Sequence, residues 1–291
     1  MTPGRGPGYA AAVRKTHSLP VALTIAGSDS GGGAGLQADL KTFASLGVHG
    51  TSVVTCVTAQ NPRRVLGLQP VSRALVRQQL EALFAELPPR AAKTGLLFSA
   101  EIIREVIPFF SNRTRVPIII DPVMLATSGA RLLQHSGVDL LRDKLFPLAA
   151  LITPNKHEAE VLLEMRIEDE EDLRVAARRI RSQFGCAALV KGGHLRGGDQ
   201  AVDIFFDGRT ELMLSARFIK GRRTHGTGCS YSAAIAGYCA LGYQLAESVS
   251  LAKEYITQAI AQASPLGRHS ALNHFWSKGR VRKARSLSDP R

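Results

Sequence analysis

The 291-residue sequence has neither the long apolar run of a membrane helix nor the paired cysteines of a zinc site. A membrane helix needs about 20 consecutive apolar residues, and no stretch approaches that length. The four cysteines are scattered without CxxC spacing, which indicates neither zinc nor a disulfide framework. The first residues also lack the apolar core of a signal peptide. We therefore expect a cytoplasmic protein.

The sequence has few acidic residues for its basic ones, with a net charge of +13. Residues 1–20 and 277–291 carry much of the excess and are rich in Gly, Pro and Ser, so we expect two flexible basic tails around a single domain at 21–276. The remaining composition, 45% apolar and 21% charged, is globular. A nucleic-acid-binding function rests on charge alone and is the weaker interpretation.

Short β-branched runs alternate with longer segments of helical period across the central region. This pattern predicts an α/β fold with a doubly wound, mostly parallel sheet and helices on both faces. The predicted strands are 21–26, 52–57, 91–97, 116–121, 149–153, 187–192 and 201–207. Residues 227–242 and 245–263 predict a helical hairpin broken at Gly242.

Glycine and polar residues follow most of the predicted strands, as in GSDSGGGAG, TAQN, DPVM, TPNKHE and KGGH. In such sheets a ligand binds beyond the carboxyl ends of the strands. The sequence therefore predicts a ligand site at this edge.

The segment THGTGCS, which opens a predicted helix, carries the strongest chemical signal. Gly226 and Gly228 let the backbone approach a ligand, and the free N–H groups of a helix's first turn bind anions. The same field would lower the pKa of the Cys229 thiol. The alternative is a tight turn with an inert buried thiol. Neither a Walker A sequence nor a GxGxxG fingerprint is present to bind phosphate elsewhere.

The other candidate residues each have a structural alternative. Asp39 projects from the first turns of a helix after a glycine-rich segment and could simply face solvent. Gln60 offers an amide that can pair with a heterocycle's edge, or it forms a turn. Asn155 and Glu158 have the spacing of a capping box, or they organise Mg²⁺ and its waters. Lys191 neutralises a phosphate or is a surface charge.

Taken together and in this order, these segments resemble the hydroxymethylpyrimidine/phosphomethylpyrimidine kinases of thiamine biosynthesis, within the ribokinase-like superfamily. The resemblance covers about residues 22–275 and rests on ALTIAGSDSGGGAGLQADLKTFASLG, TAQN, KTGLL, IIDPVMLATSG, LITPNKHEAE, LVKGGH and THGTGCSYSAAIA. It implies a ribokinase-like kinase domain at 21–276 and a homodimer. It also implies two successive ATP-dependent phosphorylations of 4-amino-5-hydroxymethyl-2-methylpyrimidine.

The resemblance also implies roles for individual residues. The pyrimidine would contact Gly27, Asp39, Gln60, Leu96 and Val123. The anion hole and the catalytic thiol would be Gly226, Thr227, Gly228 and Cys229. ATP and Mg²⁺ would lie near Asp121, Asn155, Glu158 and Lys191, with Mg²⁺ held near Glu158 mostly through water.

Our hypothesis from the sequence is that Cys229 takes the proton of the hydroxymethyl group during the first phosphorylation. Since the second phosphorylation attacks from a phosphate already ionised near neutral pH, it should need this thiol less. A pyridoxal kinase is the nearest alternative function, and a non-catalytic pyrimidine sensor on the same fold is another.

Overall fold

The computed structural model describes residues 18–111, 115–124, 133, 135–195, 199–219 and 225–278. Residues 1–17 and 279–291 of the predicted tails lie outside this part of the chain, as do residues 125–129 of the IIDPVMLATSG segment. In the described part, no helix is long and apolar enough to cross a membrane.

Nine strands of the described residues form one sheet in the order β3-β2-β1-β4-β5-β6-β7-β8-β9. They are β1 (Val21–Asp29), β2 (His49–Asn61), β3 (Arg64–Pro70), β4 (Ala91–Thr94), β5 (Ile118–Ile120), β6 (Leu151–Ile152), β7 (Ala187–His194), β8 (Gln200–Phe206) and β9 (Glu211–Arg217). Neighbouring strands from β2 to β7 in this order are parallel, whereas β3, β8 and β9 pair antiparallel at the two edges. A separate hairpin consists of β10 (Ser264–Leu266) and β11 (His269–Ala271).

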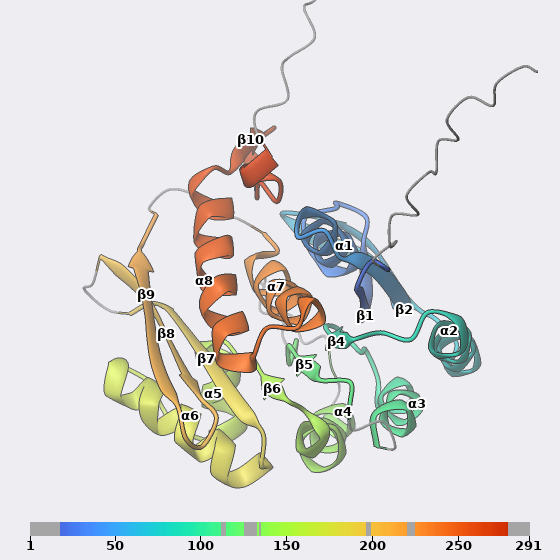
Figure 1. Cartoon of the computed structure of the whole chain (residues 1–291), viewed down its shortest axis with the longest axis horizontal. Coiled ribbons are helices and arrows are strands. Elements are labelled where there is room, and N and C mark those ends of the chain that lie inside the picture. The colour runs from blue at the N-terminus through green and yellow to red at the C-terminus, as the bar shows by residue number, and fades with distance from the viewer. Residues whose placement is uncertain are drawn as a thin grey trace, which may run out of the picture.

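Helices cover both faces of the sheet (Figure 1). The helix α1 (Gly35–Ser45) lies with α7 (Thr227–Leu241) and α8 (Leu245–Ala261) on one face. The other face carries α2 (Arg73–Glu86), α3 (Ala100–Ser111), α4 (His135–Leu140), α5 (Lys156–Leu163) and α6 (Glu170–Phe184). A π-helical turn at Leu141–Leu145 and 3₁₀ turns at Phe146–Leu148 and Trp276–Lys278 complete the helical segments of the described chain.

The apolar runs of the central strands are explained by burial on both faces. In β5, Ile118 and Ile120 belong to the core beneath α2 to α6, while Ile119 belongs to the core beneath α1, α7 and α8. Successive strand residues point to opposite faces, so a strand between two helical layers must be apolar throughout. The predicted α/β sheet with helices on both faces is confirmed.

Each predicted strand coincides with an observed one, although the segment 91–97 is extended in the sheet only as β4. The predicted helical hairpin is confirmed, because α7 ends before Gly242, whose φ of +99° favours glycine. Two edge strands were missed. β3 is mostly exposed and contains Gly67, and β9 alternates exposed residues with Leu212 and Leu214, so neither has the continuous apolar run of a central strand.

Candidate active site

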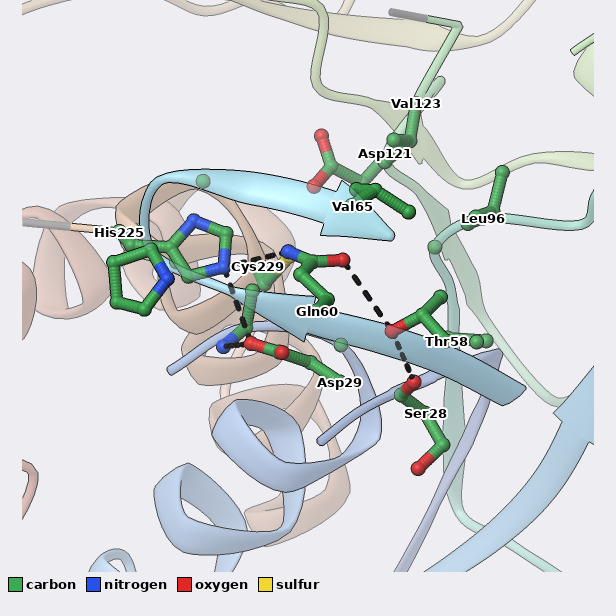
Figure 2. A pocket seen from close by; sticks show the side chains of 18 of the residues that line it. Ser28, Asp29, Thr58, Gln60, Val65, Leu96, Asp121, Val123, His225 and Cys229 are labelled. Atoms are coloured by element: carbon green, nitrogen blue, oxygen red, sulfur yellow. Dashed lines mark hydrogen bonds and ion pairs between the residues drawn. The ribbon is translucent and has the colours of Figure 1, made fainter. Parts of the chain in front are cut away.

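A cavity of about 260 Å³ lies at the carboxyl ends of the central strands. All but two of the residues predicted for the site line it. These are Gly27, Gln60, Leu96, Asp121, Val123, Asn155, Glu158, Lys191, Gly226, Gly228 and Cys229. They come from β1, β2, β7, the segments after β4, β5 and β6, and the start of α7, so the fold brings the expected loops together (Figure 2).

Asp39 is one of the two exceptions, because its side chain does not line the cavity that the other residues predicted to contact the pyrimidine share. Its side chain is fully buried, and its Oδ2 accepts hydrogen bonds from Lys93 Nζ at 2.8 Å and Thr24 Oγ1 at 2.6 Å. The helix α1 therefore turns this carboxylate toward the sheet, neither into the cavity nor toward solvent. Thr227, the other exception, lines a neighbouring cavity.

Lys93, which the sequence analysis missed, forms part of the cavity wall above Asp39. Burial acts to lower its pKa, but attraction by the carboxylates, chiefly Asp39, outweighs burial and raises the pKa above its ordinary value. The side chain is therefore a buried ammonium ion. A lysine in a strand is rarely buried in the core unless it is paired. The partner of Lys93, Asp39, lies 54 residues away, so no local sequence pattern shows the pair.

The glycine loop before α7 has two different constraints. Gly226 has a φ of +87°, and a Cβ at this position would lie 1.8 Å from the carbonyl oxygen of Gly33. A Cβ at Gly228 would instead lie 3.3 Å from Lys191 Nζ and 3.8 Å from Asp121 Oδ2. Gly226 thus allows two loops to meet, whereas Gly228 keeps the space beside the buried cation open.

Cys229 lines the cavity in the first turn of α7, but its predicted low pKa is wrong. Burial raises the pKa of the thiol to about 11; Lys93 acts to lower it, and Asp39 and Asp121 act to raise it further. The sequence identified the field of the helix end but gave no sign of the two carboxylates or of the depth of burial. The free protein therefore carries a neutral thiol here.

Acidic and basic groups alternate on the opposite side of the cavity. Lys191 Nζ donates to Asp121 Oδ1 at 3.0 Å, and both side chains are largely buried. The capping box is confirmed, because Asn155 Oδ1 accepts from the Glu158 amide at 3.0 Å and Glu158 Oε2 accepts from the Asn155 amide at 2.9 Å. Glu158 also lines the cavity, so the capping role leaves its predicted role near Mg²⁺ open as a prediction.

This acidic side fits a hydrated divalent cation. Within the described chain no group of three or more His, Cys, Asp or Glu side chains could hold a metal ion. Mg²⁺ bound to phosphates needs only one or two carboxylates and retains several waters. Repulsion by Asp121 helps raise the pKa of Glu158, and a cation near the two carboxylates would relieve that repulsion.

A second cavity, of about 510 Å³, adjoins the first across Asn155, Lys191 and Gly228. It is lined by β7, β8, β9 and α8, and its wall includes Lys253, which is ion-paired with Asp203 at 2.7 Å. The shared residues place the glycine loop and Lys191 between the two cavities.

Three polar residues around Gln60 were also missed as site residues. His225 Nε2 lies 3.1 Å from Asp29 Oδ2 and 3.0 Å from the Gln60 amide, and Thr58 Oγ1 lies 3.4 Å from the other end of that amide (Figure 2). Asp29 and His225 are 196 residues apart, so no local pattern could have paired them. The hairpin of β2 and β3 adds Arg63, Arg64, Val65 and Leu68 to the cavity wall.

Comparison with known proteins decides the family. Residues 29–274 match the family model described as phosphomethylpyrimidine kinase. The chain belongs to this family. Its members are phosphotransferases, and a kinase of this kind uses ATP.

Curated relatives agree with this membership. The chain is 49% identical to the thiamine biosynthesis bifunctional protein ThiED of Geobacter sulfurreducens over 89% of its own length, but it spans only 53% of that protein. It is 45% identical to a hydroxymethylpyrimidine/phosphomethylpyrimidine kinase of Synechococcus elongatus, covering 89% of this chain and 98% of the relative.

Solved structures include both kinds of vitamin kinase. An ADP complex of Bacillus subtilis pyridoxal kinase is 34% identical with a TM-score of 0.82, and the match covers 90% of this chain and 99% of that one. Phosphomethylpyrimidine kinase from Clostridium difficile is 40% identical with a TM-score of 0.73, covering 82% and 99% of the two chains. The ribokinase-like fold expected from the sequence is confirmed.

The Gly226 contact leads to a mutational test. In Gly226→Ala the Cβ meets the Gly33 carbonyl, so the loop must move, and we expect kinase activity to fall by about 10²-fold or more because the amides lose their positions. Gly242→Ala is the matched control, since its φ is also positive but no atom lies within 4 Å of the added Cβ. Steady-state kinetics and thermal denaturation of both variants check this. Equal losses of activity would contradict it.

Glu158 leads to a test of pH dependence. Burial, together with repulsion by Asp121, raises the pKa of Glu158 to about 7, although Lys191 acts in the opposite direction; the ordinary value is 4.5. Between these pH values the folded protein retains a proton that the unfolded chain has lost, so stability falls as pH rises. Glu158→Gln keeps the cap and removes the titration.

We expect the free energy of unfolding of Glu158→Gln, relative to that of wild type, to increase by about 3 kcal/mol between pH 4.5 and pH 8. This magnitude follows because each unit of pKa shift corresponds to about 1.4 kcal/mol. Urea denaturation of the ligand-free proteins across this range measures the difference. A difference that does not change with pH would show that Glu158 does not titrate as a buried carboxyl group.

Proposed function

We propose that this kinase transfers the γ-phosphoryl group of ATP to the hydroxymethyl group of 4-amino-5-hydroxymethyl-2-methylpyrimidine and then to the resulting monophosphate, as a step of thiamine biosynthesis. One observation carries the proposal. A single cavity combines an amide that can pair with a heterocycle, Gln60, with the start of α7 at Gly226, Gly228 and Cys229 and the largely buried ammonium of Lys191.

The cavity suits a small aromatic ring. Leu96, Val123 and Val65 supply apolar wall, and Gln60, paired with Val65 across the β2–β3 hairpin, adds a polar amide to it (Figure 2). A ring between these walls would exchange its edge hydrogen bonds with water for hydrogen bonds to the amide. Its hydroxymethyl group would then point toward Cys229 and the glycine loop.

Phosphoryl transfer depends mainly on position and on stabilising negative charge. The start of α7 lies next to Lys191, whose Nζ lies 3.3 Å from the ideal Cβ position of Gly228, and we propose that the amides of 226–229 face this space. A phosphoryl group in that space would meet the positive end of the α7 dipole and a buried cation together. We therefore assign the largest contribution to the loop and Lys191.

Cys229 is proposed to accept the proton of the hydroxymethyl group. A neutral thiol must first release its own proton to solvent, and the ammonium of Lys93 is the group that favours that loss; the thiolate can then accept the hydroxymethyl proton. Asp39 does not contact the substrate in this account. It holds Lys93 in the cavity wall by an ion pair with Lys93.

The nucleotide is proposed to lie in the 510 Å³ cavity, with its phosphates directed across Lys191 and Gly228 toward the smaller cavity. Asp121, Asn155 and Glu158 would hold Mg²⁺, mostly through water, where the two cavities meet. Mg²⁺ would neutralise part of the phosphate charge there. The homodimer implied by the resemblance and the cytoplasmic location expected from the sequence stay predictions.

Pyridoxal phosphorylation is the second candidate activity. It is favoured by the solved pyridoxal kinases, among them one from Staphylococcus aureus in complex with AMP-PCP and pyridoxal, at 30% identity and a TM-score of 0.81 over 90% of this chain and 95% of that one. A coupled ATP assay with the aminopyrimidine, its monophosphate and pyridoxal separates the candidates. Faster turnover of pyridoxal than of either pyrimidine would overturn the proposed function.

Cys229→Ala tests the base assignment within this function. We expect the first phosphorylation to fall by about 10²- to 10⁴-fold, the usual contribution of a general base, and the second by much less because its nucleophile is already ionised. The wild-type rate of the first step should also rise with pH toward the thiol pKa of about 11. Cys239→Ala, on the same helix, is the control. Equal losses in both steps would rule out Cys229 as the base.

A further inference from the structure

His225 contacts both a buried carboxylate and the amide proposed to bind the substrate. A single ring nitrogen, Nε2, lies 3.1 Å from Asp29 Oδ2 and 3.0 Å from the amide nitrogen of Gln60 (Figure 2). One nitrogen cannot donate a proton to the carboxylate and accept one from the amide at the same time. The surroundings of Asp29 decide whether Nε2 donates a hydrogen bond to the carboxylate or accepts one from the Gln60 amide.

Asp29 is in the environment of an ionised carboxylate. Its oxygens accept hydrogen bonds from the backbone amides of Gly31, Gly33 and Ala34 at 2.8, 3.1 and 2.8 Å. Burial opposes ionisation, but hydrogen bonds from His225 and the backbone outweigh burial and lower the pKa of Asp29. An ionised carboxylate can only accept hydrogen bonds. His225 Nε2 therefore carries a proton and donates it to Asp29.

This proton determines how the Gln60 amide is turned. A protonated Nε2 cannot accept a hydrogen bond from the amide nitrogen, so the oxygen end of the amide belongs on the His225 side and the nitrogen end on the Thr58 side. The two ends have nearly the same shape, and their hydrogen-bond partners decide between them.

The far end of the amide agrees with this orientation. Thr58 Oγ1 lies 2.9 Å from the Ser28 carbonyl oxygen and 3.4 Å from the end of the amide that faces it. The single hydroxyl proton of Thr58 goes to the Ser28 carbonyl, which leaves its lone pairs to accept from the amide nitrogen. Every contact from Asp29 to Ser28 then has a donor and an acceptor.

The backbone of Gln60 is held as well. Ser30 Oγ accepts a hydrogen bond from the backbone N–H of Gln60 at 2.8 Å and donates one to the backbone carbonyl of Gln60 at 2.9 Å. The pairing of β2 with β3 is irregular between Ala59 and Gln60, and such bulges redirect a side chain. Both the place and the orientation of the Gln60 side chain are therefore determined by neighbouring groups.

We propose that the hydrogen-bonded chain Asp29–His225–Gln60–Thr58 sets substrate specificity by fixing which end of the Gln60 amide faces each side of the cavity. A free lone pair then lies on the His225 side and a free N–H on the Thr58 side. This edge fits a ring that has an amino group next to an unprotonated ring nitrogen. The inference rests on the proposed function, and His225 is a positioning residue that acts through Gln60.

The position of the proton can be measured without a substrate. Long-range ¹H–¹⁵N spectra of the ligand-free enzyme with ¹⁵N-labelled histidine distinguish the two ring nitrogens, and His225→Ala identifies the signals of His225. We expect a proton on Nε2. A neutral ring protonated only at Nδ1 would overturn the proposal, whatever the substrate of the enzyme is.

The role in specificity is tested by comparing two alcohols, the aminopyrimidine and 5-hydroxymethyl-2-methylpyrimidine, which lacks the amino group. We expect wild type to prefer the first in kcat/KM. His225→Ala and Gln60→Ala should each reduce that preference about tenfold or more, the effect of about 1.4 kcal/mol of hydrogen bonding. In the double variant His225→Ala should add almost nothing to Gln60→Ala.

Thr58 supplies a matched pair that leaves the loop before α7 unchanged. Thr58→Val should reduce the preference a few-fold, and Thr58→Ser should retain it because the hydroxyl remains. The proposed hydrogen-bonded chain would be overturned if the losses of preference added up in the double variant of His225 and Gln60. It would also be overturned if Thr58→Val and Thr58→Ser had equal effects. A wild-type enzyme that acts on neither pyrimidine would overturn the proposed function and with it the specificity role, while the spectrum would still decide the position of the proton.

Discussion

At Gly226 the backbone before α7 passes so close to the loop after β1 that a Cβ would lie 1.8 Å from the Gly33 carbonyl oxygen. This contact joins segments nearly two hundred residues apart, and the site is arranged around it. On one side it places His225 beside Asp29 and Gln60. On the other it places the start of α7 above Lys191 and Asp121, in the space that Gly228 keeps open. The proposed pyrimidine end and the proposed phosphate end of the site thus depend on the same backbone contact.

Buried charge is the second organising feature. Lys93 forms an ion pair with Asp39, and Lys191 forms one with Asp121, so the cavity wall contains two ammonium ions that are each balanced by a carboxylate of the protein. Such pairs contribute little to stability once desolvation is counted, but they keep the cations in place and charged. The cations have a function only when further negative charge arrives. Phosphate groups and a thiolate at Cys229 are the anions that we propose this arrangement stabilises.

Much of the fold was predictable because β5 and its neighbours carry unbroken apolar runs that only a two-sided sheet explains. Much of the site was predictable because its residues follow strand ends, which converge at one edge of a parallel sheet. The errors came from tertiary contacts. Nothing near Asp39 in the sequence shows that Lys93 faces it, and nothing near Cys229 shows how deeply its thiol is buried. Edge strands such as β3 were missed because exposed strands lack a strong pattern.

The same limit explains why His225 had no assigned role beside the glycines of its loop, since its partners lie on β1 and β2. The central claim is that one cavity holds the pyrimidine at Gln60 and the transferring phosphate between the 226–229 amides and Lys191. A crystal structure with a non-hydrolysable ATP analogue and the aminopyrimidine tests it most directly. We expect the ring against Gln60 with its hydroxymethyl group directed at Cys229, and the γ-phosphate within hydrogen-bonding distance of Lys191. A ring bound away from Gln60, or a triphosphate bound away from the glycine loop, would contradict it.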